Sequence, residues 1–168
     1  MTRWFLAVAV ALTTIAPDAL AKPLKVEGLV IDEAFARPTP RGKAGDPIPA
    51  GAAFVTIENK GDKTYQLVGA STPVAGQVEI QQAQRIGKST RTRRVLALNL
   101  APGERLTIGP DSEYRLALIG LRRKMEDGDV FPLVLEFDGI GKVEIEVETK
   151  YEIYTDSGTR YNQRAKPQ

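Results

Sequence analysis

The chain has 168 residues, of which 42% are hydrophobic and 26% charged, and these values are typical of one globular domain with a packed core. Its formal net charge of +2 is too small to indicate nucleic acid or an anionic membrane as a partner. The chain contains no histidine and no cysteine, which excludes disulfides and metal sites that need imidazole or thiolate ligands.

Residues 1–21 have the pattern of a cleaved signal peptide. Arg3 gives the positive start, Trp4–Ile15 is an apolar run, and Ala19-Leu20-Ala21 fits the small-x-small cleavage pattern before Lys22. The alternatives are a short membrane anchor or a buried strand, but the run is short for a bilayer span. No cysteine follows the run, so a lipid anchor on cysteine is excluded. We therefore expect a soluble, exported, periplasmic protein.

The rest of the chain alternates strand-like runs with turns and shows few helix signals. About nine such runs, separated by Gly, Pro, Asn and Asp, predict an antiparallel β-sandwich, a single all-β domain over residues 22–149. Arg37–Ala50 contains four prolines and is expected to be a loop. Tyr114–Leu121 is almost continuously apolar and is expected to be a central strand. The predicted strands are Val26–Ile31, Ala52–Asn59, Tyr65–Ser71, Gln77–Gln84, Ser89–Leu98, Leu106–Ile108, Tyr114–Leu121, Val130–Phe137 and Val143–Val147.

Residues 150–168 form a separate polar tail in this reading. Tyr151, Tyr154 and Tyr161 are expected to dock part of the tail on the domain. The last residues are expected to fray.

Several segments in order resemble the periplasmic copper chaperones called PCuAC. The similarity runs from about Val26 to Val147, and the order and spacing of the segments make it specific. The segments are Ala36–Pro40, Ala52–Asp62, Leu67–Ala75, Ala101-Pro102-Gly103, Gly120-Leu121-Arg122 and Asp127–Leu133.

The resemblance implies a cupredoxin-like β-sandwich. It also implies binding of Cu(I) by histidine and methionine side chains, and delivery of copper toward the copper site of cytochrome oxidase. These ligands suit Cu(I), because a soft cation prefers thioether and imidazole groups.

The residues that should bind copper are replaced in this chain. The alignment places the first family histidine at Gln81, a methionine at Thr92, and the His-x-Met pair at Arg115 and Ala117. Ala83 stands where some members carry a methionine. A shift of one residue would put Tyr114 and Leu116 at the pair, which would not restore a ligand. The resemblance therefore describes a degenerate metal site.

Hydrogen-bonding and basic residues stand at or beside these positions. We hypothesise that Arg91, Arg93 and Arg115 form one basic face with Thr92, which binds an acidic partner or a small anion, since an arginine fork suits carboxylate or phosphate. The alternative is that the arginines are a solvated face that only keeps the domain soluble. The expected partner is another periplasmic or membrane-anchored protein, with no nucleic acid, no membrane insertion and no cofactor.

A site for a hard cation is a weaker alternative. Glu144, Glu146 and Glu148 alternate along one strand, and Asp127 and Asp129 flank a glycine, so oxygen ligands for Ca²⁺ are available. The sequence lacks the EF-hand pattern, and the simpler interpretation of the glutamates is the solvent face of an edge strand.

The sequence gives little support to an enzyme. It has no histidine to act as general base and no cysteine nucleophile. Gly139–Lys142 resembles a phosphate loop only faintly, because it leads into a strand. We expect a non-catalytic accessory protein that acts through protein contacts. The alternative is a copper carrier with atypical ligands, such as Met125 with carboxylates, or ligands shared with a partner.

Overall fold

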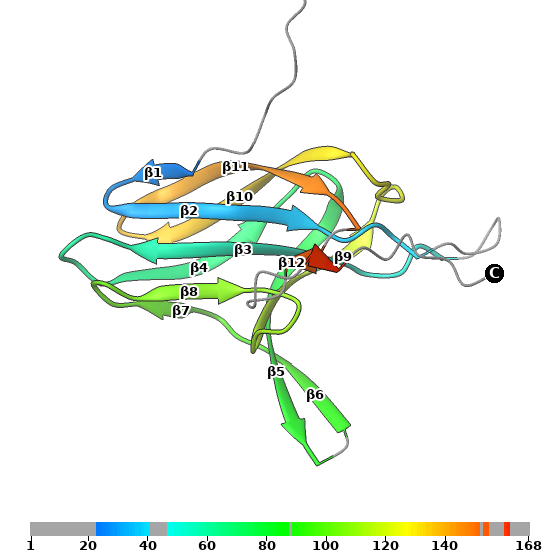
Figure 1. Cartoon of the computed structure of the whole chain (residues 1–168), viewed down its shortest axis with the longest axis horizontal. Helices are drawn as coiled ribbons and strands as arrows, with labels where there is room; N and C mark the ends of the chain where they lie inside the picture. Colours follow the sequence, from blue (N-terminus) through cyan, green and yellow to red (C-terminus); the bar gives the residue numbers. More distant parts are fainter. Residues whose placement is uncertain (1–22, 41–46, 88, 152, 155–159, 162–168) are drawn as a thin grey trace, which may run out of the picture.

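A computed structural model describes residues 23–40, 47–87, 89–151, 153–154 and 160–161 (Figure 1). Within these ranges the chain forms strands and no helix, as the sequence predicts. The strands are β1 (Leu24–Val26), β2 (Leu29–Ala36), β3 (Gly51–Asn59), β4 (Tyr65–Ser71), β5 (Ala75–Ile86), β6 (Ser89–Arg94), β7 (Leu98–Leu100), β8 (Arg105–Ile108), β9 (Tyr114–Leu121), β10 (Val130–Asp138), β11 (Gly141–Thr149), β12 (Ile153–Tyr154) and β13 (Arg160–Tyr161).

The main strands form one continuous sheet that folds over on itself. The order is β6-β5-β9-β8-β3-β2-β11-β10-β4-β7, with β1 added beside β2. Most pairings are antiparallel, and β12 and β13 form a separate two-stranded pair. The two ends of the path meet at β4 and β5, which follow each other in the chain but do not pair. This arrangement is the predicted β-sandwich.

The core lies between the two layers and draws side chains from nearly every long strand. In β10 and β11 buried and exposed residues alternate strictly, so Leu133, Leu135 and Val147 are fully buried while Glu144 and Glu146 face outward. β9 is central, as predicted, because β5 pairs with one of its edges and β3 and β8 with the other.

Three details of the predicted strands are wrong. The run Val26–Ile31 is two strands, because Glu27 and Gly28 both have positive φ and reverse the chain. The run Ser89–Leu98 is also two strands, and β6 and β7 stand at opposite ends of the sheet order. β11 is not an edge strand, since it pairs with β10 along its length and with β2 at Glu148 and Thr149.

β5 and β6 extend beyond the sandwich as a two-stranded hairpin (Figure 1). Ile86 pairs with Ser89, so only Gly87 and Lys88 connect the two strands, and Gly87 takes a φ of +61° that favours glycine. Every residue of β6 is exposed. The hairpin is therefore held by its register and its backbone ladder, with little burial.

The remaining expectations concern the loop, the tail and the terminus. The described parts of the Arg37–Ala50 loop contain no strand, as predicted. Residues 1–21 and the end of the tail lie outside the described residues, as do the side chains of Tyr154 and Tyr161, while Tyr151 is 37% exposed. In the described part of the chain no helix has the length and apolar character needed to cross a membrane.

Candidate functional site

The four positions that the resemblance assigns to copper ligands lie on three adjacent strands, β6, β5 and β9. Gln81 on β5 is paired with Arg94 of β6 on one side and with Arg115 of β9 on the other. Residues directly opposite each other in an antiparallel sheet point to the same face, so Arg94, Gln81 and Arg115 form one row. Thr92 and Ala117 lie in the adjacent rows of that face, because side chains repeat every second residue.

Three of the four positions are joined by hydrogen bonds. The Arg115 guanidinium donates from Nη2 to Thr92 Oγ1 at 2.6 Å and from Nε to Gln81 Oε1 at 3.3 Å. It therefore reaches across β5, where the small Ala83 is the residue paired with Thr92. Ala117 offers only a methyl group and is 7% exposed. The Arg115 side chain thus contacts those of Gln81 and Thr92 and lies at the centre of the group.

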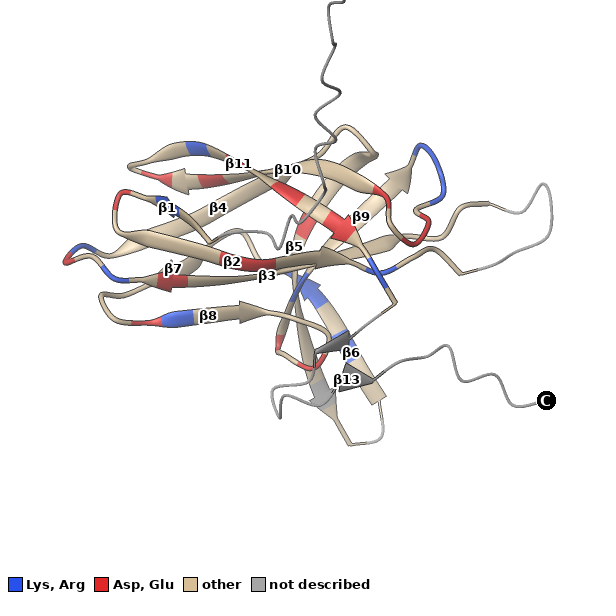
Figure 2. Cartoon of the chain, turned by 45° about the horizontal axis from the view of Figure 1, so that its top comes forward, with Lys and Arg blue, Asp and Glu red and all other residues tan. Residues whose placement is uncertain are grey.

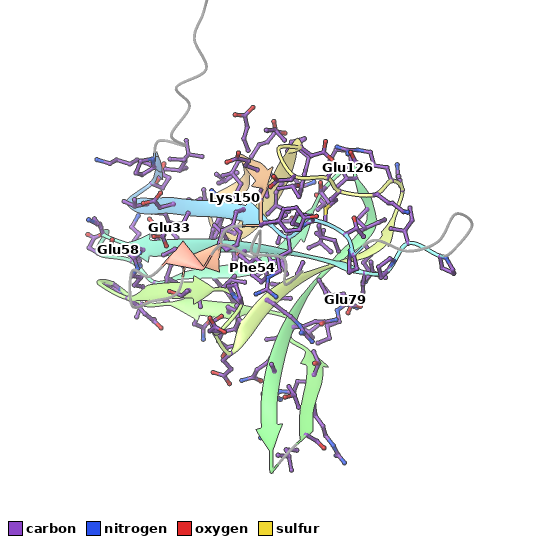
Figure 3. The ribbon with its side chains drawn as sticks, turned by 45° about the vertical axis from the view of Figure 1, so that its right-hand side comes forward. Glu33, Phe54, Glu58, Glu79, Glu126 and Lys150 are labelled. Atoms are coloured by element: carbon purple, nitrogen blue, oxygen red, sulfur yellow. The ribbon has the colours of Figure 1, made fainter. Side chains whose placement is uncertain are left out.

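The network continues along β5 to a carboxylate. Gln81 Nε2 donates to Glu79 Oε2 at 3.0 Å, and Gln77 Nε2 donates to Glu79 Oε1 at 3.3 Å. Figure 3 labels Glu79 near the place where the hairpin leaves the body. Both carboxylate oxygens therefore already accept hydrogen bonds from the two glutamine amides.

The predicted basic face is divided by the register of the hairpin. Arg93 pairs with Gln82 and Arg91 with Gln84, which places both arginines on the face opposite to Arg115. Arg93 Nε donates to Gln82 Oε1 at 2.6 Å, and Gln82 in turn contacts Glu113. The expectation that Arg91, Arg93 and Arg115 share one face is therefore wrong, because adjacent odd and even positions of β6 point in opposite directions.

Arg94, and not Arg91 or Arg93, is the β6 arginine that shares a face with Arg115. It lies in the same row as Arg115, two strands away, which corresponds to about 10 Å between their Cα atoms. Among the described residues no carboxylate lies within 4 Å of either guanidinium. Figure 2 shows basic positions on β6 and acidic positions on β11, in different parts of the molecule.

Glu79 is a site residue that sequence reasoning missed, and Arg94, which stands near Thr92 in the basic stretch, is one that it did not single out. The period-two alternation of β6 groups Arg94 with Thr92, but only the pairing of Ile86 with Ser89 across the short turn brings Arg94 beside Gln81. The Gly87-Lys88 pair between two polar runs was the available signal for that register.

The residues considered for other metal sites have structural roles. Met125 is 1% exposed, its backbone N–H donates to Thr39 Oγ1 at 2.6 Å, and its Cε atom lies against Gly51. Asp129 accepts hydrogen bonds from the Glu126 backbone N–H and from Arg123, and these two contacts lower the pKa of its carboxyl group.

Carboxylates elsewhere do not converge either. Asp127 accepts a hydrogen bond from the Tyr151 backbone N–H, and the row Glu144, Glu146 and Glu148 faces outward along β11. In the ranges that the structure describes, no three residues of the His, Cys, Asp and Glu types are grouped so that they could hold a metal ion.

Solved structures that include PCuAC domains have the same fold. The apo PCuAC domain from PmoF1 superposes with a TM-score of 0.62 at 21% identity, over 76% of this chain and 98% of that domain. The copper-bound PCuAC domain from PmoF2 gives 0.59 at 19% identity, over 76% and 97%. The Cu(I) form of DR1885 from Deinococcus radiodurans gives 0.55 at 26% identity, over 80% and 85%. These likenesses confirm the resemblance in fold.

A search of curated proteins found no match. A family model described as "Putative lipoprotein LpqE-like" matches residues 29–149, which span β2 to β11 and include all four replaced positions. Since the match covers most of the chain, this protein belongs to the LpqE-like family, on the fold shared with PCuAC domains.

Proposed function

We propose that this chain is a non-catalytic accessory protein of the PCuAC-like type that acts through contacts with another protein, and that it does not carry copper at the family's ligand positions. The observation that carries the proposal is the Arg115 guanidinium, which is bonded to the side chains at two of the other three positions. A fixed positive charge stands where a ligand for a cation would be needed.

Electrostatics and ligand chemistry both oppose copper at this place. The guanidinium group stays protonated, and two like unit charges 4 Å apart near a protein surface repel by about 4 kcal/mol. Gln81 and Thr92 offer neutral oxygen and nitrogen atoms, whereas Cu(I) prefers thioether and imidazole. The one methionine outside the signal-like segment, Met125, is buried in the core.

The same chemistry that opposes a cation favours a carboxylate. Arg94 and Arg115 present two guanidinium groups on one face with no carboxylate within 4 Å in the described part of the chain. Arginine binds carboxylates through short, charge-assisted hydrogen bonds, often in pairs. An acidic segment of a partner protein is therefore the ligand we propose for this face.

We place this activity outside the cytoplasm, in the periplasm. The signal-like pattern of residues 1–21 supports this location, and so does membership in a family described as lipoprotein-like. These 168 residues contain no cysteine to carry a lipid, so we propose that export ends in a soluble form.

Competition for copper tests the proposal. The exported chain is mixed with Cu(I), and separately with Cu(II), in the presence of a chelator, and the metal that stays with the protein is measured. We expect the copper to remain with the chelator, while the PmoF2 PCuAC domain, which has a copper-bound structure, serves as the positive control. Retention of one equivalent would overturn the proposal and favour the alternative of atypical or partner-shared ligands.

A further inference from the structure

A groove lies where the two ends of the folded sheet fail to close. It has a volume of about 360 Å³ and is lined by β4, by the first half of β5, by Arg94 and the two residues after it, and by Glu136 of β10. β4 and β5 border it without pairing to each other. The groove is thus a gap between two strands, open at the surface of the sandwich.

Both strands present an unpaired backbone edge to this gap. β4 pairs with β7 only at Tyr65–Leu67, so the Val68–Ser71 part has no strand partner opposite β10 in the described structure. β5 pairs with β6 only from Gln81 onward, and the Ile80 carbonyl oxygen accepts a hydrogen bond from the Val95 N–H, so the Ala75–Glu79 part has no strand partner opposite β9 in the described structure. Exposed strand edges of this kind recognise an extended peptide by adding it as a strand.

The side chains around the gap are basic, acidic and apolar, since Glu79 and Glu136 line it together with Arg94, Val68 and Leu96. Val68 and Leu96 line the groove and are 38% and 76% exposed, so apolar surface is available beside the free edges. Arg94 also lines the groove and belongs to the row with Arg115. The basic row and the groove are therefore one continuous surface, with the arginines at one end. Because Glu79 and Glu136 repel a carboxylate, the acidic residue of a bound segment is expected at the arginine end.

We propose that this surface, the Arg94 groove, binds an extended segment of a partner protein by strand addition, with a carboxylate of the segment on Arg94 and Arg115. The four residues Val68–Ser71 give an edge of roughly 13 Å, enough to pair about four residues of the segment. The apolar side chains of the segment contact Val68 and Leu96. The inference rests on the proposed function and specifies how the acidic partner is held.

A display library of random seven-residue peptides supplies the probe. We expect selection on the full chain to enrich peptides with Asp or Glu next to β-branched or aromatic residues. Binding of a selected peptide should weaken about tenfold in Arg94→Glu, because a charged hydrogen bond is lost. Leu96→Ser should weaken it as well. The matched controls, Arg122→Glu and Leu24→Ser, change an exposed residue of the same type elsewhere and should bind normally.

Hydrogen exchange provides the second measurement. The bound peptide should slow exchange of backbone amides within Val68–Ser71 or Ala75–Glu79. If binding depends on Arg94 and Arg115 but not on Leu96, and exchange in these two segments is not slowed, strand addition in the groove is wrong. The proposal of an acidic partner would then still stand. No enrichment, or binding that the charge reversals leave unchanged, would overturn both. If the chain forms a dimer and Leu96→Ser dissociates it, the groove is occupied by a second copy of the chain. This result would also contradict the proposal.

Discussion

The body of the sandwich and the β5–β6 hairpin differ in what holds them. The body buries one continuous apolar cluster between its layers, whereas all six residues of β6 are exposed. The positions that the resemblance assigns to copper ligands lie on the hairpin and on β9; Gln81, Thr92 and Arg115 are not part of the core, whereas Ala117 is 7% exposed and buried. Changes at Gln81, Thr92 and Arg115 therefore leave the packing of the body untouched.

The largest effect is expected in the body, at Met125. Met125→Ala should lower the free energy of unfolding by about 2–5 kcal/mol, because it leaves a cavity against Gly51 and the core. Denaturant unfolding measures the change. A loss below 1 kcal/mol would show that this thioether is not a core group and would reopen its role as a ligand.

A buried amide of the body should give the next largest effect. Asn59 is fully buried, and its side chain donates to the Lys63 and Leu100 carbonyl oxygens and accepts from the Gly61 N–H. Asn59→Ala should cost roughly 1–3 kcal/mol, since buried polar groups lose their partners. The exposed Asn99, changed to Ala as a control, should cost less than about 0.5 kcal/mol. Equal losses of stability in the Asn59 and Asn99 variants would contradict the structural role of the buried Asn59 amide.

Substitutions in the hairpin should change the stability of the protein far less. Thr92→Val removes the hydroxyl that accepts from Arg115, yet the site is exposed, so stability should change by less than about 0.5 kcal/mol. The same substitution should alter binding of an acidic peptide, because Arg115 loses the partner that orients it. Thermal unfolding and peptide binding are measured for the Thr92 variant and for the natural chain. A loss of stability as large as that of the Asn59 variant would mean that the hairpin is part of the folding unit.

The smallest effect concerns pH and the turn at Asp129. The Glu126 backbone N–H, and then Arg123, lower the pKa of Asp129 from 3.8, so the charged form is favoured in the folded state. This stabilisation is present above the unfolded pKa and is lost as the pH falls through the lower folded pKa. Asp129→Asn should therefore unfold more easily than the natural chain at neutral pH, with the difference shrinking below pH 3.8. A difference in stability between the two chains that grew as the pH fell would contradict the lowered pKa of Asp129.

Much of the body could be predicted because its signals are local. The alternation of Val143–Val147 and the apolar run Tyr114–Leu121 identify their strands and burial directly. The break of residues 89–98 into β6 and β7 could not be predicted in this way, because the polar first half and apolar second half read as one run. Only the folded register shows that the two strands lie at opposite ends of the sheet.

The site was predictable in part. The resemblance assigns four positions to the ligands, and the structure places the Arg115 side chain in contact with those of Gln81 and Thr92. The sequence does not indicate which neighbouring arginine joins them. A one-residue difference in position separates Arg93 from Arg94, and in a strand this difference moves the side chain to the opposite face.

Restoring the ligands tests the central claim most directly. A variant with Gln81→His, Thr92→Met, Arg115→His and Ala117→Met is compared with the natural chain by chelator competition for Cu(I). We expect the variant to retain about one equivalent of copper, because the positions are held on one face of three paired strands, and the natural chain to retain none. Equal retention of one equivalent by the natural chain, or failure of a folded variant to bind copper, would contradict it.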